Sequence, residues 1–216
     1  MLDADATIIT TTSAKQGAAP TFKSSFGFHP LAAWCANTGE CLAMLLRPGN
    51  AGANTAADHI RVLARALDQV PGPARAKILV RIDGAGATHE LLEYLRKLNT
   101  SRRTVRFTVG WKITDADEAA IARLPEHTWE SALDQDGKIQ DSYQVAELTG
   151  LSTREGWPEN MRLIVRWVRP SRRHAKKFTA LERKTGWRYS VLATDIGRMH
   201  RIRGSHQVQF LERAAP

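Results

Sequence analysis

The expected fold is set by a strand, an aspartate and a glycine turn in direct succession: Lys77-Ile78-Leu79-Val80-Arg81-Ile82-Asp83-Gly84-Ala85-Gly86. Residues 77–82 form a short, mostly apolar run, as in a buried strand. Thr88 follows the turn and is a good N-cap for a helix. A strand that passes through an acidic residue and a glycine turn into a helix is typical of an α/β protein. In such proteins that residue projects into a crevice at the carboxyl ends of the strands.

The flanking segments extend this pattern. Residues 2–9 alternate between polar and apolar side chains and predict a first strand, and residues 26–35 and 41–47 predict a hairpin. Three helices are expected, one capped by Asn54, one capped by Thr88 and one over residues 115–124. With a further strand over 105–111, the order β–β–β–α–β–α–β–α predicts a mixed sheet covered by helices. On the first helix the predicted buried stripe consists of Ile60, Leu63, Ala64 and Leu67.

The pattern changes after Pro125. Residues 143–148, 161–168 and 187–193 read as strands separated by turns and a basic stretch. We therefore predict a core over residues 1–125, a β-rich basic insertion over 126–195 and a short tail over 196–216.

Charge is unevenly distributed along the chain. Residues 1–150 carry a net charge of −1 and residues 151–216 carry +10, which gives the formal net charge of +9. A basic C-terminal third indicates a polyanionic partner such as nucleic acid, although a solvated basic surface explains the charge equally well. The expected phosphate contacts, which provide affinity rather than sequence reading, are Arg172, Arg173, Lys176 and Lys177.

Composition indicates a globular protein of the cytoplasm. Hydrophobic residues make up 43% and charged residues 25% of the chain. No apolar run approaches the roughly 20 residues that cross a bilayer, and the first residues lack the basic segment of a signal peptide. Cys35 and Cys41 are expected to be reduced hairpin residues.

Two carboxylates are candidates for chemistry. Asp5 lies in the first predicted strand and Asp83 directly follows the strand over 77–82. If these strands are neighbours, the two side chains meet and offer the oxygen ligands that Mg²⁺ prefers. A pair of such ions about 3.5–4 Å apart can cleave a phosphodiester. Asp3 shares the face of Asp5, so spacing alone does not choose between them.

Other polar and aromatic residues give weaker signals. The glycine turn could bind nucleotide phosphates, but His89 occupies the third glycine position of the G-x-G-x-x-G fingerprint. His29 and His59 have no partner at zinc spacing and are expected to pack or form hydrogen bonds. The tryptophans of the insertion could stack on bases, but core packing is the preferred interpretation; they are Trp157, Trp167 and Trp187.

Several stretches together resemble a known family. They match, in order and spacing, the group 1 DDE insertion-sequence transposases that are common in actinobacteria. The matching stretches are Asp5-Ala6-Thr7, Gly17 to Lys23, Gly27 to Leu31, Leu46 to Gly52, Asn54 to His59, Arg81 to Thr88 and Val145 to Gly150.

The resemblance implies a ribonuclease-H-like fold with a β-rich insertion. It also implies Mg²⁺- or Mn²⁺-dependent cleavage and strand transfer of double-stranded DNA at the ends of an insertion element. The first acid of the family, in an Asp-x-Thr motif, corresponds to Asp5 rather than Asp3, and the second corresponds to Asp83.

The resemblance also leads us to expect a fragment. The third acid of the family is a glutamate in an Arg-Val-Glu-Asp-like helix, and Glu212 lies too early to match it. We therefore expect a chain truncated at both ends, with little activity alone and a homodimer only when complete. The rival interpretation is a non-catalytic DNA-binding remnant that uses the basic segment.

Overall fold

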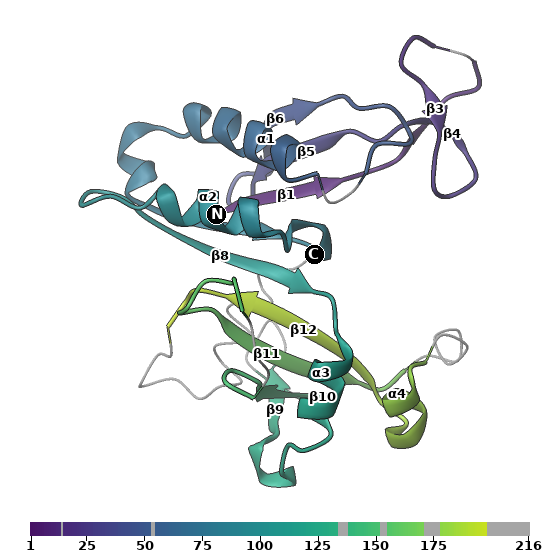
Figure 1. Cartoon of the computed structure of the whole chain (residues 1–216). Coiled ribbons are helices and arrows are strands. Elements are labelled where there is room, and N and C mark those ends of the chain that lie inside the picture. Colours follow the sequence, from purple (N-terminus) through teal and green to yellow (C-terminus); the bar gives the residue numbers. More distant parts are fainter. Residues whose placement is uncertain (14, 53–54, 134–137, 152–154, 171–177, 198–216) are drawn as a thin grey trace. The chain divides into compact units, whose positions relative to one another are not determined.

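The computed structural model describes residues 1–13, 15–52, 55–133, 138–151, 155–170 and 178–197 (Figure 1). The chain divides into two compact units, Met1–Val109 and Gly110–Pro216. The division falls inside strand β8 (Thr104–Trp111). The predicted limits of core, insertion and tail stay predictions.

A five-stranded mixed sheet forms the centre of the first unit. Its strand order is β6 (Glu40–Leu45), β5 (Leu31–Cys35), β1 (Leu2–Ala6), β7 (Lys77–Ile82) and β8. Strand β5 runs antiparallel to both β1 and β6, whereas β1, β7 and β8 are parallel. The predicted neighbourhood of the first strand and the strand over 77–82 is therefore confirmed.

Helices supply the rest of the core of this unit. Helix α1 (Ala56–Gln69) packs on β5, β6 and helix α2 (His89–Lys97). Thr88 caps α2 as predicted, since its side chain accepts a hydrogen bond from the backbone N–H of Leu91. The buried leucines of α2, at positions 91, 92 and 95, are at most 1% exposed, so their burial is the main force that holds the helix on the sheet.

The predicted stripe of α1 is partly wrong. Leu63 and Leu67 are buried as expected, but Ile60 and Ala64 are only half-buried. The buried face is completed instead by His59, Val62 and Ala66. Because apolar residues occur on more than one face of this helix, their spacing does not fix which face turns inward. Its N-cap is Thr55, and Asn54 lies outside the described residues.

The first predicted strand is also shorter than expected. Strand β1 ends at Ala6, and the chain then enters a small antiparallel sheet instead of continuing to Ile9. This sheet consists of β2 (Ile9–Thr10), β4 (Phe26–Phe28) and β3 (Ala19–Pro20), and we call residues 9–28 the arm (Figure 1). The predicted strand over 26–35 is likewise two strands, β4 and β5, separated at His29-Pro30.

The second unit is β-rich, as predicted. Its antiparallel sheet has the order β12 (Arg188–Thr194), β11 (Arg162–Val168), β10 (Ile139–Glu147) and β9 (Glu130–Leu133). Helix α3 (Asp115–Ile121) precedes the sheet and ends before the predicted Leu124, since Pro125 disfavours helical backbone just before it. The short helix α4 (Ala180–Thr185) was not predicted.

A buried ion pair joins two strands of this unit. Arg162 is 9% exposed, and its guanidinium contacts both carboxylate oxygens of Glu147, at 2.5 and 3.3 Å. The backbone N–H of Leu163 donates to the Thr149 hydroxyl at 3.0 Å. The family-like stretch from Val145 to Gly150 therefore has a structural role in this unit.

The helices of the described part include none that is both long enough and apolar enough to cross a membrane.

Candidate functional site

Asp5 and Asp83 lie at the same edge of the sheet. Asp5 is the fourth residue of β1, and Asp83 directly follows β7; both are exposed. The register pairs Asp3 with Arg81 and ends at the pair of Ala4 with Ile82, and Asp5 and Asp83 are the next residues of the two chain segments. Neighbouring strands are about 4.8 Å apart, and partners in a parallel pair point to the same side. The two carboxylates therefore come from adjacent strands at one edge.

The backbone orients the Asp5 carboxylate. The N–H of Ala6 donates to Asp5 Oδ1 at 2.8 Å. Because the side chain is exposed, a hydrated cation can reach it without crossing the core. The residue thus combines a fixed orientation with open access.

A tight turn positions Asp83. The N–H of Gly86 donates to the Asp83 carbonyl at 3.0 Å, which closes the 3-10 turn Gly84–Gly86. A Cβ atom on Gly86 would lie 2.4 Å from Cγ2 of Ile82, so the turn can approach β7 this closely only with glycine there. Gly84 has open space around it. The predicted succession of strand, aspartate, turn and helix is therefore present in the structure. Within the turn, Gly86 is the position at which only glycine fits.

Asp3 lies in a different environment. Its carboxylate forms an ion pair with Arg81, and the two side chains are 24% and 12% exposed. Burial raises the pKa of the Asp3 carboxyl, and the Arg81 charge only partly opposes this rise. A carboxylate with its own arginine is less available to a metal than an exposed one. The environment therefore favours Asp5 over Asp3, a choice that spacing left open.

Arg47 anchors the loop beside the arm. It is 4% exposed, and its Nε donates to the carbonyl of His29 at 2.9 Å. Its Nη1 donates to the carbonyl of Gly52 and to Asp58 Oδ2, both at 3.1 Å. His29 is itself buried and its Nδ1 lies 3.0 Å from the carbonyl of Ala51. The family-like stretch over 46–52 thus supports the base of the arm.

The histidines have the predicted roles. His59 is 2% exposed, and its Nδ1 lies 3.0 Å from the carbonyl of Thr55. His29 forms the corresponding contact with Ala51. Both rings are therefore packed and hydrogen-bonded in the interior.

The acidic edge fits part of a divalent-cation site. Two carboxylates can supply part of the octahedral oxygen shell of Mg²⁺, which usually keeps several waters and takes phosphate oxygens from its substrate. Within the described ranges no cluster of three or more His, Cys, Asp or Glu side chains could hold a metal. The described chain therefore offers two acids at this edge.

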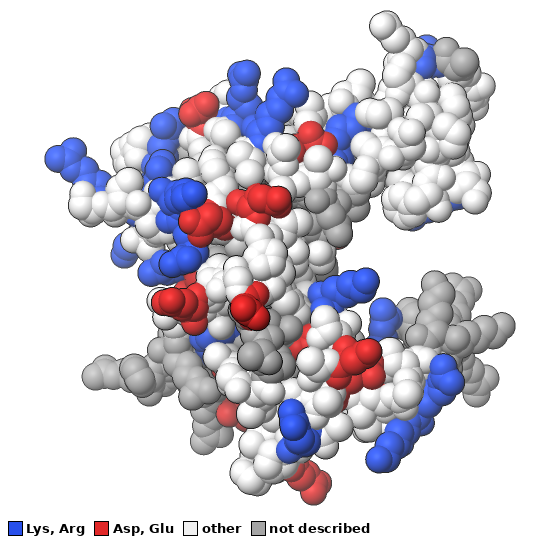
Figure 2. Space-filling view, in the orientation of Figure 1, with Lys and Arg blue, Asp and Glu red and all other residues white. Residues whose placement is uncertain are grey.

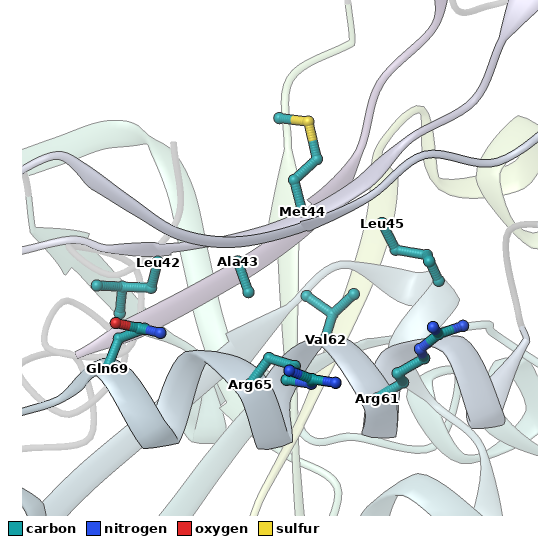
Figure 3. A pocket seen from close by; sticks show the side chains of 8 residues that line it. All are labelled: Leu42, Ala43, Met44, Leu45, Arg61, Val62, Arg65 and Gln69. Carbon is teal, nitrogen blue, oxygen red and sulfur yellow. The ribbon is translucent and has the colours of Figure 1, made fainter.

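A groove between β6 and α1 is chemically different. Its lining combines apolar strand residues with Arg61, Arg65 and Gln69 of the helix (Figure 3). No acidic side chain lines it, and β5 separates β6 from β1 in the sheet. The groove is therefore not part of the acidic site.

The predicted phosphate contacts Arg172, Arg173, Lys176 and Lys177 lie outside the described residues.

The tryptophans of the second unit contact one another. The rings of Trp167 and Trp187 have centroids 3.9 Å apart, and those of Trp111 and Trp157 are 4.5 Å apart. All three tryptophans named from the sequence are half-buried and none belongs to the buried core, so they form ring contacts but the predicted core packing is only partly met.

Sequence reasoning missed Arg47 and Arg81, two covered arginines that form ion pairs with carboxylates in the first unit. Arg81 interrupts an apolar strand and lies two residues before Asp83, so it points to the same side of the sheet. An arginine inside an otherwise apolar strand is the signal that could have predicted an acidic partner on the neighbouring strand.

Comparison with known proteins identifies the family and the fold. No curated protein matches the chain. The fold is similar to that of the piggyBac transposase in a cryo-EM structure of its synaptic complex with hairpin DNA, with a TM-score of 0.55 and 10% sequence identity. The alignment covers 98% of this chain and 37% of the piggyBac chain. This similarity confirms the expected ribonuclease-H-like fold. The family model for the transposase DDE domain group 1 matches residues 1–207, and the chain belongs to this family.

Proposed function

We propose that this chain forms a catalytic core portion of a DNA transposase, in which Asp5 and Asp83 bind Mg²⁺ or Mn²⁺ for DNA cleavage and strand transfer at element ends. The parallel register of β1 and β7 carries the proposal, because it brings both acids to one edge. Family membership supports the reaction class. The piggyBac structure, which contains DNA, supports a DNA partner, although this chain spans 37% of that protein's length.

The chemistry follows from the two exposed carboxylates. A bound divalent cation would activate a water molecule and stabilise the leaving oxygen of a phosphodiester. Two observations support this pair of ligands: the Ala6 N–H donates to the Asp5 carboxylate, and Asp83 directly precedes the Gly84–Gly86 turn. Arg81, two residues before Asp83, forms an ion pair with Asp3.

Localised oxidative cleavage tests the proposed site. Fe²⁺ is a divalent cation that can replace Mg²⁺, and with ascorbate and peroxide it cuts the backbone close to where it is bound. We expect cuts in the segments around Asp5 and Asp83, and loss of both in Asp5→Asn. Asp68→Asn, an exposed carboxylate on α1, serves as the matched control and should leave the cuts unchanged. Cuts that persist unchanged in Asp5→Asn would contradict the proposal.

We further propose that these 216 residues alone have little strand-transfer activity. The described residues bring two acids to the edge, and two carboxylates place a second metal ion poorly. Incubation with supercoiled plasmid in Mg²⁺ or Mn²⁺ should give little nicking. Efficient metal-dependent cleavage that Asp83→Ala abolishes would overturn this part of the proposal.

The alternative function, DNA binding without catalysis, rests on the net charge of +10 in residues 151–216. We propose that Arg172, Arg173, Lys176 and Lys177 contact phosphates. The double variant Arg172→Glu/Arg173→Glu should weaken DNA binding and flatten its dependence on salt. Binding that survives Asp5→Ala and Asp83→Ala, in a chain that fails the iron test, would favour this alternative.

A further inference from the structure

The arm presents an exposed apolar and basic tip. Phe22 is 71% exposed, and Lys23 follows it with its Nζ 5.7 Å from the Phe22 ring centroid. Ile9 and Phe26 are 47% and 37% exposed on the same small sheet. An aromatic ring displayed beside an ammonium group has the chemistry of a surface that contacts bases and phosphates.

The tip is held by a hydrogen-bonded turn. Thr21 is 8% exposed, and its hydroxyl lies 2.7 Å from that of Ser25 and accepts from the N–H of Lys23 at 3.3 Å. The N–H of Ser24 donates to the Thr21 carbonyl at 3.1 Å. Phe22 also packs edge-on against the buried ring of His29, with centroids 5.6 Å apart. The exposed ring is therefore fixed in place.

Close backbone packing fixes the arm as a whole. A Cβ atom on Gly27 would lie 2.0 Å from the carbonyl oxygen of Ile9, and one on Gly49 would lie 2.2 Å from that of Ala19. Only glycine allows these approaches, which pack the strands of the arm on one another and on the loop that Arg47 anchors. These contacts hold the paired strands of the arm together and against that loop.

The arm leaves the sheet at the acidic edge. The register pairs Asp5 with Ala32 and Ala6 with Leu31, so the end of β1 and the start of β5 lie together. The N–H of Thr7 donates to the carbonyl of Pro30 at 3.1 Å and closes the base of the arm. The arm therefore starts within a few residues of Asp5.

The arm has no acidic residues, which favours a negatively charged partner. No Asp or Glu occurs between Asp5 and Glu40, and the arm contains Lys15 and Lys23. In the view of Figure 2, the projection that carries β3 and β4 shows no acidic side chain. An apolar tip without acids, on an arm whose base lies next to Asp5, fits a polyanion with exposed bases better than a protein.

We infer that the arm is a DNA-contacting element, in which Phe22 stacks on a base at a DNA end and Lys23 contacts the neighbouring phosphate. This inference rests on the proposed function, because it assigns the arm to the DNA that the acidic edge acts on. Aromatic stacking on a base tolerates any sequence, so the arm contributes affinity and position rather than sequence specificity.

Fluorescence anisotropy of the full chain tests the inference. The probe is a fluorescein-labelled duplex with a three-nucleotide single-stranded tail. Phe22→Ala should weaken binding about tenfold. Met44→Ala removes an apolar side chain that is 59% exposed on β6 and should leave binding within about twofold of wild type. Lys23→Gln should reduce the slope of log affinity against log salt by about 0.7–0.9, while Lys77→Gln, at the opposite end of β7, should not.

Failure of the inference differs from failure of the proposed function. Wild-type affinity in Phe22→Ala, or no binding of the probe by the wild-type chain, overturns the inference whatever the iron test shows. An effect of Phe22→Ala on the molar mass from light scattering, with DNA binding unchanged, would assign the arm to a second copy of the chain and also overturn it. Absence of iron cuts in the wild-type chain, or cuts that persist in Asp5→Asn, overturns only the metal site when the Phe22 effect is intact.

Discussion

The carboxylate in the middle of β1 and those at its carboxyl edge lie in two different environments, one covered and one exposed. In the middle of β1 and β7, Asp3 is paired with Arg81, and both side chains are largely covered. At the carboxyl edge, two residues further along, Asp5 and Asp83 are exposed. The alternation that places all four side chains on one side of the sheet is the same in both regions. What differs is exposure: Asp3 and Arg81 are largely covered, whereas Asp5 and Asp83 are open to solvent.

This difference separates structural from functional acids. A covered carboxylate needs a built-in cation, because burial disfavours its charged form. Arg47 and Asp58 form a second covered pair of the same kind, at the base of the arm. An exposed acid at a strand end needs no built-in cation to stay charged and is open to a cation from solution. We therefore predict that substitutions in the covered pairs lower the free energy of unfolding strongly, whereas substitutions of the exposed acids lower it little.

Arg47→Met should have the largest effect on stability. It removes the donor to two backbone carbonyls and leaves Asp58 without its cation, so the free energy of unfolding should fall by about 3 kcal/mol or more. Urea unfolding followed by circular dichroism measures this. Arg61→Met, an exposed arginine of α1, is the matched control and should change stability by less than about 0.5 kcal/mol. Equal effects of the two variants would contradict the account.

Arg81→Met should cost about 2 kcal/mol at pH 7. Without the arginine, the pKa of Asp3, which burial already raises above 3.8, rises further. A raised pKa in the folded state means that stability is retained below 3.8 and lost as the pH rises through the folded value. The penalty should therefore shrink at pH 4, because lowering the pH favours the protonated form of Asp3 more in the folded variant than in the unfolded one. Urea unfolding at both pH values checks this, and a penalty that grows at pH 4 would refute it.

Gly86→Ala should cost about 1–3 kcal/mol, because its Cβ would overlap Ile82 and displace the turn that places Asp83. Gly84→Ala in the same turn meets no atom within 4 Å and is the matched control, with an expected change below about 0.5 kcal/mol. Thermal unfolding of both variants provides the measurement. If the two alanine variants unfolded at the same temperature, the close approach of Gly86 to β7 would not constrain the site.

Asp5→Asn should have the smallest effect on stability, within about 0.5 kcal/mol. The side chain is exposed, and the asparagine oxygen can still accept from the Ala6 N–H. Urea unfolding without metal checks this value. A loss of 2 kcal/mol or more would show that Asp5 is a structural acid like Asp3.

The sequence predicts the strand–turn–helix unit well, because its signals are local. The apolar run of β7, the Thr88 cap and the leucines of α2 all indicate the elements that the structure contains. The end of β1 could not be predicted, because the alternation continues past Ala6. There the antiparallel pairing of Ile9 with Phe28 draws the chain into the arm.

The candidate site shows the same limit. The positions of Asp5 and Asp83 follow from motif and strand order, and the structure supplies the register that relates them. The pairing of Asp3 with Arg81 depends on which strands are neighbours, which is a tertiary property. For that reason spacing alone left Asp3 and Asp5 equivalent, whereas their environments distinguish them.

Mn²⁺ binding to the full chain, measured by the loss of the free-ion signal in electron paramagnetic resonance, tests the central claim most directly. We predict that the wild-type chain binds Mn²⁺ and that Mg²⁺ competes for the site. Asp5→Asn and Asp83→Asn should each weaken binding by about tenfold or more, since each removes one of two charged ligands, while Asp68→Asn binds as wild type. Wild-type affinity in folded Asp5→Asn and Asp83→Asn variants would contradict the claim that these two acids form a metal site.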